Sequence, residues 1–351
     1  MPLSPQTRRQ IARFHSLKRG YYSFVLLVVI SLAAIVSEWI AGNRPLAIHY
    51  GGHWYLPVYG SIHPGTDFGL NYAYETDYRD LARKFKSDRS GNWLLMPPVP
   101  YGPNENCYLG QDFQPRAPTL ATRHLLGTDQ LNRDIFARLL YGLRNSLLFA
   151  GGFVILVYLV GVSVGCAMGY FGGLFDLVFQ RFLEIWSLLP FLLVVIIVRA
   201  ALPEGTQFGL GLILAIVVAF SWTSISYYVR TTTYREKARD YVAAAQVLGA
   251  GDLRIIFRHI LPNVLSLLVT FLPFTAALAI SSLTALDYLG FGLPPPMPSW
   301  GELLRQGTAN LDAPWIVASA FCALSLVLIL ITFVGEAIRD AFDPKKFTYY
   351  R

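Results

Sequence analysis

Charged residues are scarce in this chain of 351 residues, and their scarcity points to its class. Asp, Glu, Lys and Arg make up 15% of the sequence, whereas a soluble domain averages about 25%. Apolar residues make up 54%, and the mean hydropathy is +0.43. Because the apolar residues occur in long blocks, the composition excludes a disordered or fibrous chain and argues against a water-soluble enzyme.

Cysteine is also scarce, with only Cys107, Cys166 and Cys322 in the chain. The last two lie in apolar runs, so we expect no disulfide framework within the chain. The net charge of +7 could suggest nucleic-acid binding. In a membrane protein, however, a basic excess is typical of cytoplasmic loops beside anionic lipid, and we expect no nucleic-acid partner.

The sequence lacks the common motifs for nucleotide and metal chemistry. It contains neither a G-x-x-x-x-G-K-[ST] phosphate loop nor an H-E-x-x-H pair. His49 and His53 are four residues apart, but their segment has no helical pattern that would place them on one face. We therefore expect no metal site and no cofactor in this chain. If the protein uses ATP, another chain binds it with magnesium and hydrolyses it.

Six apolar stretches are long enough to cross a hydrocarbon core, which needs about 20 helical residues. They are Tyr22–Ala41, Asn145–Gly169, Phe182–Ala200, Phe208–Val229, Val264–Leu283 and Pro314–Val334. The first could instead be a cleaved signal peptide, because basic residues precede it. Its long apolar run and the lack of an A-x-A site favour an uncleaved anchor. The sequence thus predicts an all-α polytopic membrane protein with six spans.

The distribution of Lys and Arg predicts the orientation of these spans. The arm 1–21 carries five such residues, the stretch 230–262 six and the tail 336–351 four. Six spans place all three segments on one side, which we assign to the cytoplasm. The segment 42–144 is too long for the charge rule and is placed in the periplasm. The core 145–335 then contains the other five spans.

The predicted periplasmic insert is rich in proline and aromatic residues. Between Asn43 and Pro118 it holds nine of the 21 prolines, together with many tyrosines, Trp54 and Trp93. It is too aromatic for a disordered linker and favours a small irregular or β-containing lobe. Such a lobe could bind a partner or a substrate, or simply pack on itself at the membrane interface.

One pentapeptide, Gly161–Gly165, formally fits the hydrolase pattern G-x-S-x-G. That motif needs a strand, a strained turn and a helix, and no unpaired strand can lie inside an apolar span. The spacing of Gly161, Gly165 and Gly169 is instead typical of a row of small residues that lets another helix approach closely. We therefore expect a packing face, with Ser163 not a nucleophile and no catalytic residue in the chain.

The basic stretch 230–262 contains a predicted helix–glycine–helix unit. Its first helix is expected to share a face through Tyr241, Ala244, Ala245 and Leu248, and Gly249 is expected to end it with a positive φ. Asp252 can cap a second helix that carries Leu253, Ile256, Phe257 and Ile260 before Pro262 opens the next span. The unit could insert into a groove on another protein, or form a re-entrant interfacial helix pair.

A second motif, Leu126–Arg138, precedes the second span. Thr128 or Asp129 can cap an amphipathic helix there, and Asp134 and Arg138 have the spacing of an i,i+4 ion pair. We expect Leu131, Ile135, Leu139 and Gly142 to line the apolar face. The two carboxylates beside arginines are interpreted as paired rather than catalytic.

These motifs resemble the inner-membrane permease subunits of ABC peptide importers, the dipeptide/oligopeptide family. Leu126–Asp134 matches the family's L-G-T-D-x-x-G-R-D except at Asn132. Tyr241–Gly249 and His259–Asn263 are similar to its cytoplasmic EAA loop. The later stretches Ala285–Gly292, Pro298–Gly301, Ala313–Trp315 and Gly335–Pro344 look like its last loop and tail. The large insert is most similar to that of the YejE-type permeases of microcin C and peptide importers.

The resemblance implies a type I permease with a periplasmic insert between its first two spans. It implies a heterodimer with a second permease, two ATP-binding cassette domains that bind ATP and magnesium, and a periplasmic binding protein. It assigns a periplasmic motif with Gly127, Thr128, Asp129, Arg133 and Asp134. It also assigns ATPase coupling to Tyr241, Ala243, Ala244, Ala245, Leu248, Gly249, Asp252, Ile256, Arg258, His259 and Pro262. Ala243 stands where the family usually has glutamate, so one polar contact is missing or is supplied by the partner.

Two other classes remain open from the residues alone. A secondary transporter would need inverted repeats and an ion site near mid-membrane, and neither is visible in the sequence. A membrane-embedded enzyme would need a catalytic set, and the only formal match is the pentapeptide Gly161–Gly165. Measuring whether uptake depends on ATP or on the proton gradient distinguishes an ATP-driven importer from a secondary transporter. A serine-reactive probe on Ser163 distinguishes a permease from a membrane-embedded enzyme.

Overall fold

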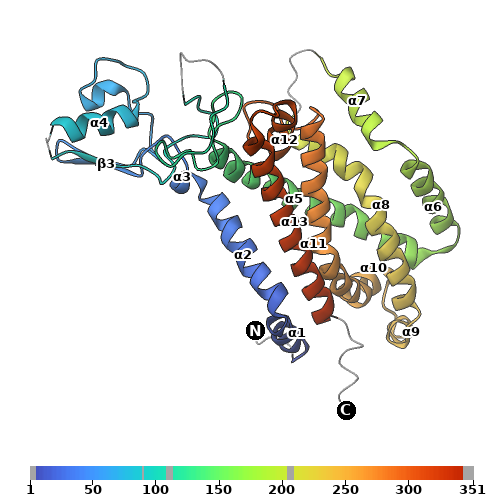
Figure 1. The fold of residues 1–351 in the computed structure, drawn as a ribbon. Coiled ribbons are helices and arrows are strands. Elements are labelled where there is room, and N and C mark those ends of the chain that lie inside the picture. The colour runs from blue at the N-terminus through green and yellow to red at the C-terminus, as the bar shows by residue number, and fades with distance from the viewer. Residues whose placement is uncertain (1–4, 89–90, 108–113, 204–208, 343–351) are drawn as a thin grey trace.

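A computed structural model describes residues 5–88, 91–107, 114–203 and 209–342 of the chain. Long helices run side by side, with a small lobe at one end of the bundle (Figure 1). Within the described residues, five helices are long and apolar enough to cross a membrane, and a bent pair makes a sixth span if counted as one. The predicted all-α polytopic architecture is thereby confirmed.

In chain order, the helices and strands are α1 Pro5–Ser16, α2 Lys18–Ile35, α3 Ser37–Ile40, β1 Ala47–Tyr50, β2 His53–Tyr55, the 3₁₀ turn Gly65–Phe68, α4 Tyr78–Asp88, β3 Trp93–Leu95, α5 Ile135–Phe171, α6 Gly173–Ser187, α7 Phe191–Ala201, α8 Leu210–Lys237, α9 Asp240–Val247, α10 Asp252–Ile255, the π-helix Ile256–Ile260, α11 Leu261–Tyr288, α12 Trp300–Ala309 and α13 Pro314–Phe342.

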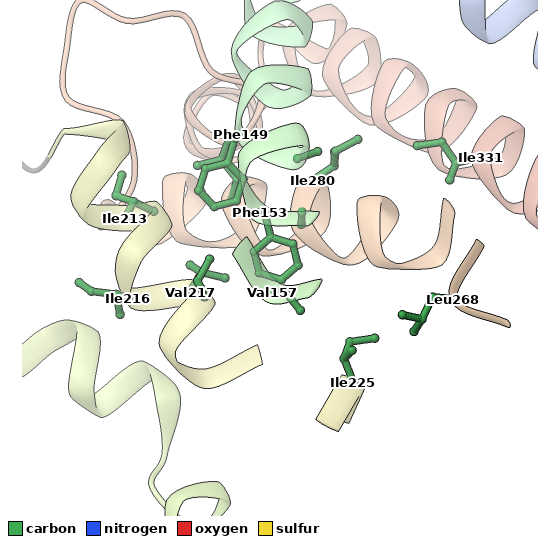
Figure 2. Packing of buried hydrophobic residues seen from close by; sticks show 14 of the residues in the cluster. Phe149, Phe153, Val157, Ile213, Ile216, Val217, Ile225, Leu268, Ile280 and Ile331 are labelled. Atoms are coloured by element: carbon green, nitrogen blue, oxygen red, sulfur yellow. The ribbon is translucent and has the colours of Figure 1, made fainter. Parts of the chain in front are cut away.

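Helix α5 lies at the centre of the bundle. It packs most extensively against α8 and also contacts α11, while α2 packs against α13. Phe149, Phe153 and Val157 of α5 are buried against side chains of α8, α11 and α13 (Figure 2). Burial of apolar side chains stabilises a fold by roughly 25 cal/mol per Å² only when the same surface would otherwise be exposed to water. In lipid, close packing and buried polar contacts therefore carry more of the specificity.

The predicted spans differ from the observed helices chiefly at their ends. The first span, predicted to reach Ala41, ends at Ile35 and is followed by the short α3. The predicted span Phe182–Ala200 is not one straight helix, because it is divided between α6 and α7, which are bent by 73° around residues 188–190. Pro190 is the N-cap of α7, where its missing N–H costs no helical hydrogen bond. The predicted start at Phe208 and the tail beyond Phe342 lie outside the described residues.

Both ends of the described chain and the predicted coupling unit lie at one end of the bundle. Figure 1 shows α1, the C-terminal end of α13 and α9 together there, with the lobe and α12 at the opposite end. This agrees with the prediction that the three basic segments share one side. The lobe and the coupling unit therefore lie at opposite ends of the bundle.

The lobe, residues 42–134 as far as the structure describes them, contains the expected β-structure. Three antiparallel strands have the order β2-β1-β3, and α4 packs against β3. Ile48, Phe68, Leu81 and Phe85 form its own small apolar core. The strands are only three or four residues long. The part of the lobe around the sheet therefore has an apolar core of its own, and the lobe is joined to α3 and α5.

Candidate functional site

The α9–α10 hairpin, residues 240–260, protrudes from the bundle around a glycine turn. Gly249 has a φ of 79°, as predicted, and its amide donates to the Gln246 carbonyl at 2.9 Å. The Ala250 amide donates to the Ala245 carbonyl at 3.0 Å. These two bonds satisfy the last carbonyls of α9 as in a Schellman motif. A Cβ at Gly249 would meet nothing within 4 Å, so only its backbone requires glycine.

The hairpin presents apolar side chains outward. Val247 and Leu248 are 88% and 86% exposed, and Leu253 and Phe257 are also exposed. The predicted shared face is wrong only in including Ala245, because Val242 and Ala245 are the buried residues of α9. Tyr241, Ala243, Ala244 and Leu248 instead lie on the outward side. Closely spaced exposed apolar residues at a basic protrusion are typical of a surface that another protein covers.

The second helix of the hairpin is not a separate element. It runs through the π-helix Ile256–Ile260 into α11, with Pro262 in the first turn of α11 where proline is tolerated. Ile256 and Ile260 are buried, whereas Arg258 is exposed and His259 half-buried. A movement of the hairpin would therefore move the N-terminal end of α11 with it.

Hydrogen bonds tie the hairpin to three long helices. The Tyr241 hydroxyl donates to Glu236 of α8 at 2.6 Å, and Asn263 of α11 donates to the same hydroxyl at 3.0 Å. The predicted cap by Asp252 is wrong, because Gly251 is the N-cap residue. Asp252 instead accepts a 2.6 Å bond from the Tyr170 hydroxyl of α5. The hairpin is therefore fastened to α5, α8 and α11.

The motif Leu126–Asp134 forms a buried turn rather than the start of a helix. Asp134 is the N-cap of α5 and accepts from the Ala137 amide at 2.8 Å, so caps at Thr128 or Asp129 are wrong. Thr128 instead accepts from the Arg116 amide at 2.8 Å, and its carbonyl accepts from the Trp315 indole at 3.2 Å. The turn therefore connects the start of α5 to α13.

A network of opposite charges occupies the centre of this turn. Arg133 bonds Asp129 at 2.7 Å and Glu302 at 2.9 Å. Arg138, which is fully buried, hydrogen-bonds Glu302, and its Nε lies 3.5 Å from an Asp129 carboxylate oxygen in a second ion pair. The predicted Asp134–Arg138 pair is wrong, since Asp134 bonds His124 at 2.8 Å. Burial lowers the pKa of Arg133, but Asp129 and Glu302 outweigh it and raise that pKa above its ordinary value.

Two backbone positions explain the motif's glycine preferences. Gly127 has a φ of 78°, and a Cβ there would lie 2.6 Å from the Arg116 carbonyl oxygen. Asn132, the departure from the family pattern, has a φ of 57°. Asparagine tolerates this left-handed region better than other side chains, which accounts for the replacement of glycine. The predicted apolar face is partly wrong, because Leu131 is 46% exposed, whereas Ile135, Leu139 and Gly142 are buried.

The glycine row on α5 packs as predicted. A Cβ at Gly161, Gly165 or Gly169 would lie 2.6 to 2.8 Å from atoms of α8. Ser163 points elsewhere, and its exposed hydroxyl donates to the Leu159 carbonyl of its own helix at 2.7 Å. The described residues contain no cluster of three potential metal ligands. His49 lies against the rings of Trp54 and Trp93, and no metal role follows for it.

Several residues of these sites were not identified from the sequence. Glu302 of α12 completes the charge network from more than 160 positions away. Arg230 of α8 pairs with the buried Asp176 of α6, which also accepts from the Tyr234 hydroxyl at 2.7 Å. No local spacing signals such pairs. Only the proximity of Glu302 to the Pro298–Gly301 motif offered a hint.

Comparison with known proteins defines the class. The family described as binding-protein-dependent transport system inner membrane component matches residues 161–348. The match covers more than half of the chain, and it includes the α9–α10 hairpin and α13. This chain belongs to that family of transport permeases.

Curated relatives extend the similarity to nearly the whole chain. The inner membrane ABC transporter permease protein YejE of Escherichia coli is 40% identical, covering 98% of both chains. The peptidoglycan transport system permease protein YejE of Agrobacterium fabrum is 39% identical, covering 98% of this chain and 94% of its own. The oligopeptide transport system permease protein OppC of Lactococcus lactis is 35% identical over 65% of this chain and 78% of its own. The predicted YejE-type resemblance is confirmed.

Proposed function

We propose that this chain is the permease subunit of an ATP-driven importer that moves peptides or modified peptides across the bacterial inner membrane. The observation that carries the proposal is the exposed α9–α10 hairpin in a chain of the binding-protein-dependent family. Relatives named for oligopeptide and peptidoglycan transport support the substrate class. A second permease would complete the path, and a periplasmic binding protein would deliver the substrate.

The hairpin is suited to transmit movement from a separate ATPase. Its exposed Val247, Leu248, Leu253 and Phe257 would enter a groove of the partner, which would bind ATP and magnesium. Because hydrogen bonds fasten the hairpin to α5 and α8, and it continues into α11, closure of the ATPase would shift these helices together. An ATP-dependent bias between inward- and outward-open states requires such a joint.

Ala243 shapes the proposed contact. It is exposed at the position where related loops carry glutamate. Without that carboxylate, apolar contacts and the neighbouring Arg258 would supply the docking energy. Restoring the side chain with Ala243→Glu offers a direct probe of this surface, since the site is open on the structure.

The proposed orientation places the hairpin in the cytoplasm and the lobe in the periplasm, following the basic asymmetry of the loops. Asp252 and Asp88 are exposed at opposite ends of the bundle. A membrane-impermeant thiol reagent applied to intact spheroplasts should label Asp88→Cys and spare Asp252→Cys in a cysteine-free background. Labelling of Asp252→Cys alone would invert the topology.

Reconstitution tests the function itself. The chain, the second permease, the ATPase and the binding protein would be placed in proteoliposomes with a labelled oligopeptide. We expect uptake to require ATP and binding protein and to persist when the proton gradient is abolished. Uptake that follows the proton gradient without ATP would contradict the proposal and favour an ion-coupled carrier.

A further inference from the structure

We propose that a groove in the lobe binds an extended, carboxylate-bearing peptide by adding it to the free edge of β3. This inference rests on the proposed peptide transport and names the substrate class that the lobe selects. The groove has a volume of about 830 Å³, within the range of small-ligand sites. Helix α4, strand β3, and residues from the stretches 100–107 and 121–123 line it.

The groove follows the edge of the sheet and not one of its faces. Both Leu94 and Leu95 line it, although neighbouring side chains of a strand point to opposite faces. In the order β2-β1-β3, strand β3 has a partner on one side only. The groove therefore offers an unpaired strand edge flanked by side chains.

The backbone of Leu94 is available to a ligand strand. The Leu95 carbonyl accepts from the Leu46 amide at 2.8 Å, on the β1 side. Because consecutive residues of a strand direct their polar groups to opposite sides, the amide and carbonyl of Leu94 point to the free edge. Outside the β1–β3 ladder, nothing in the described part of the chain hydrogen-bonds them. Such groups are the usual template for peptide addition.

The charges around the groove favour an anionic ligand. Arg79 is paired with Glu105 and Arg83 with Asp80. Lys86 and Arg123 also line the groove, and neither side chain has an ion pair or hydrogen bond with a residue that the structure describes. The one carboxylate in the lining, Asp77, accepts from backbone amides at the start of α4. Two cations are thus left for a ligand.

The backbone at Arg123 provides an independent sign of a site. Its φ is 60°, in a region that a long side chain rarely adopts. Residues held there cluster at ligand-binding positions. The ring of Tyr101 lies under the Arg79 guanidinium at 4.9 Å, and its hydroxyl donates to the Thr122 carbonyl at 2.7 Å. Tyr101, Leu94 and Met96 give the groove an apolar part of its lining. Alternating acidic and apolar side chains would suit this lining.

The test measures peptide binding to the full chain in nanodiscs by fluorescence anisotropy. The probe is a labelled hexapeptide of alternating glutamate and valine, compared with its glutamine analogue. We expect tighter binding of the acidic peptide, and about a tenfold loss of its affinity in Lys86→Glu/Arg123→Glu, because each exposed charge contact contributes little alone. The control Arg8→Glu/Arg9→Glu reverses two positive charges at the far end of the bundle and should change nothing.

Backbone methylation of the probe tests strand addition without altering the protein. In one peptide the odd backbone nitrogens are methylated and in the other the even ones. A β-edge ligand should lose binding in one of these registers and retain it in the other. Equal affinities for both, or for the acidic and glutamine peptides, would overturn the proposal.

Two further outcomes distinguish peptide binding in the groove from docking of a folded partner and from failure of the proposed transport function. If the charge reversal weakened docking of the purified binding protein but not of the free peptide, the occupant would be a folded partner and the inference would be wrong. In the reconstituted importer, ATP-driven uptake without preference for acidic peptides would refute the groove's role alone. Absence of any ATP-driven peptide uptake would instead refute the proposed function.

Discussion

Adding a single methyl group at Gly165 should loosen the contact between α5 and α8. The new Cβ would lie 2.6 Å from the Ser226 carbonyl oxygen and 2.8 Å from the Val229 Cβ. Overpacking of this kind costs about 1–3 kcal/mol. Replacing glycine by alanine within a helix returns about 0.5–1 kcal/mol. We therefore expect Gly165→Ala to lower the free energy of unfolding by up to about 2.5 kcal/mol.

Gly151 supplies a matched control on the same helix. A Cβ there would meet nothing within 4 Å, so Gly151→Ala should leave stability unchanged or raise it by up to about 1 kcal/mol. The two variants differ only in their neighbours, and their effects should have opposite signs. Unfolding of the purified chain in mixed micelles, followed by circular dichroism, measures both. Equal stability of the two variants would refute the close-packing interpretation.

Three other substitutions test the remaining features. Arg138→Met removes one of the two arginines that pair with Glu302 and Asp129. Because Arg133 still pairs with both carboxylates, the substitution should cost less than the about 3–5 kcal/mol of a fully broken buried pair. It should still cost more than Arg83→Met at an exposed pair, which should cost less than about 1 kcal/mol; the unfolding midpoints in micelles distinguish these. Asn132→Gly should be nearly neutral, whereas Asn132→Val should lose about 1–3 kcal/mol at the positive φ, and comparable midpoints would contradict this. Ser163→Ala should leave peptide uptake unchanged, and a loss of uptake in an assembled complex would revive the catalytic interpretation of Gly161–Gly165.

The features that sequence predicted well are those with a local cause. Span lengths follow from runs of apolar residues, and the glycine row on α5 is visible as a four-residue spacing. The positive φ of Gly249 follows from the end of a short helix with no other terminator. Each of these depends on residues within one or two helical turns. Their agreement with the structure is therefore expected.

The errors arose where distant residues decide between local choices. Thr128, Asp129 and Asp134 can all cap a helix, and the Arg138–Glu302 and Arg133–Glu302 contacts across the fold favour the last. Which face of α9 points outward depends on how α9 packs against α8 and α10, where Val242 and Ala245 are its buried residues, and periodicity alone does not reveal this. Likewise, the sequence around Pro190 does not show whether the chain forms one kinked helix or two helices with a bend between them, because this depends on the packing of neighbouring elements.

The most direct test of the central claim concerns Gly249 in the reconstituted importer. Gly249→Val forces a β-branched residue to a φ of 79°, whereas Gly249→Asn keeps a side chain that tolerates this region. A Cβ at position 249 would meet nothing within 4 Å, so a steric clash would not account for the effect of either substitution. We measure peptide uptake and ATPase activity stimulated by binding protein in the same vesicles. The account predicts that Gly249→Val loses both while Gly249→Asn and the assembly of the complex are preserved. Full stimulation and uptake with Gly249→Val would contradict transmission through the α9–α10 hairpin.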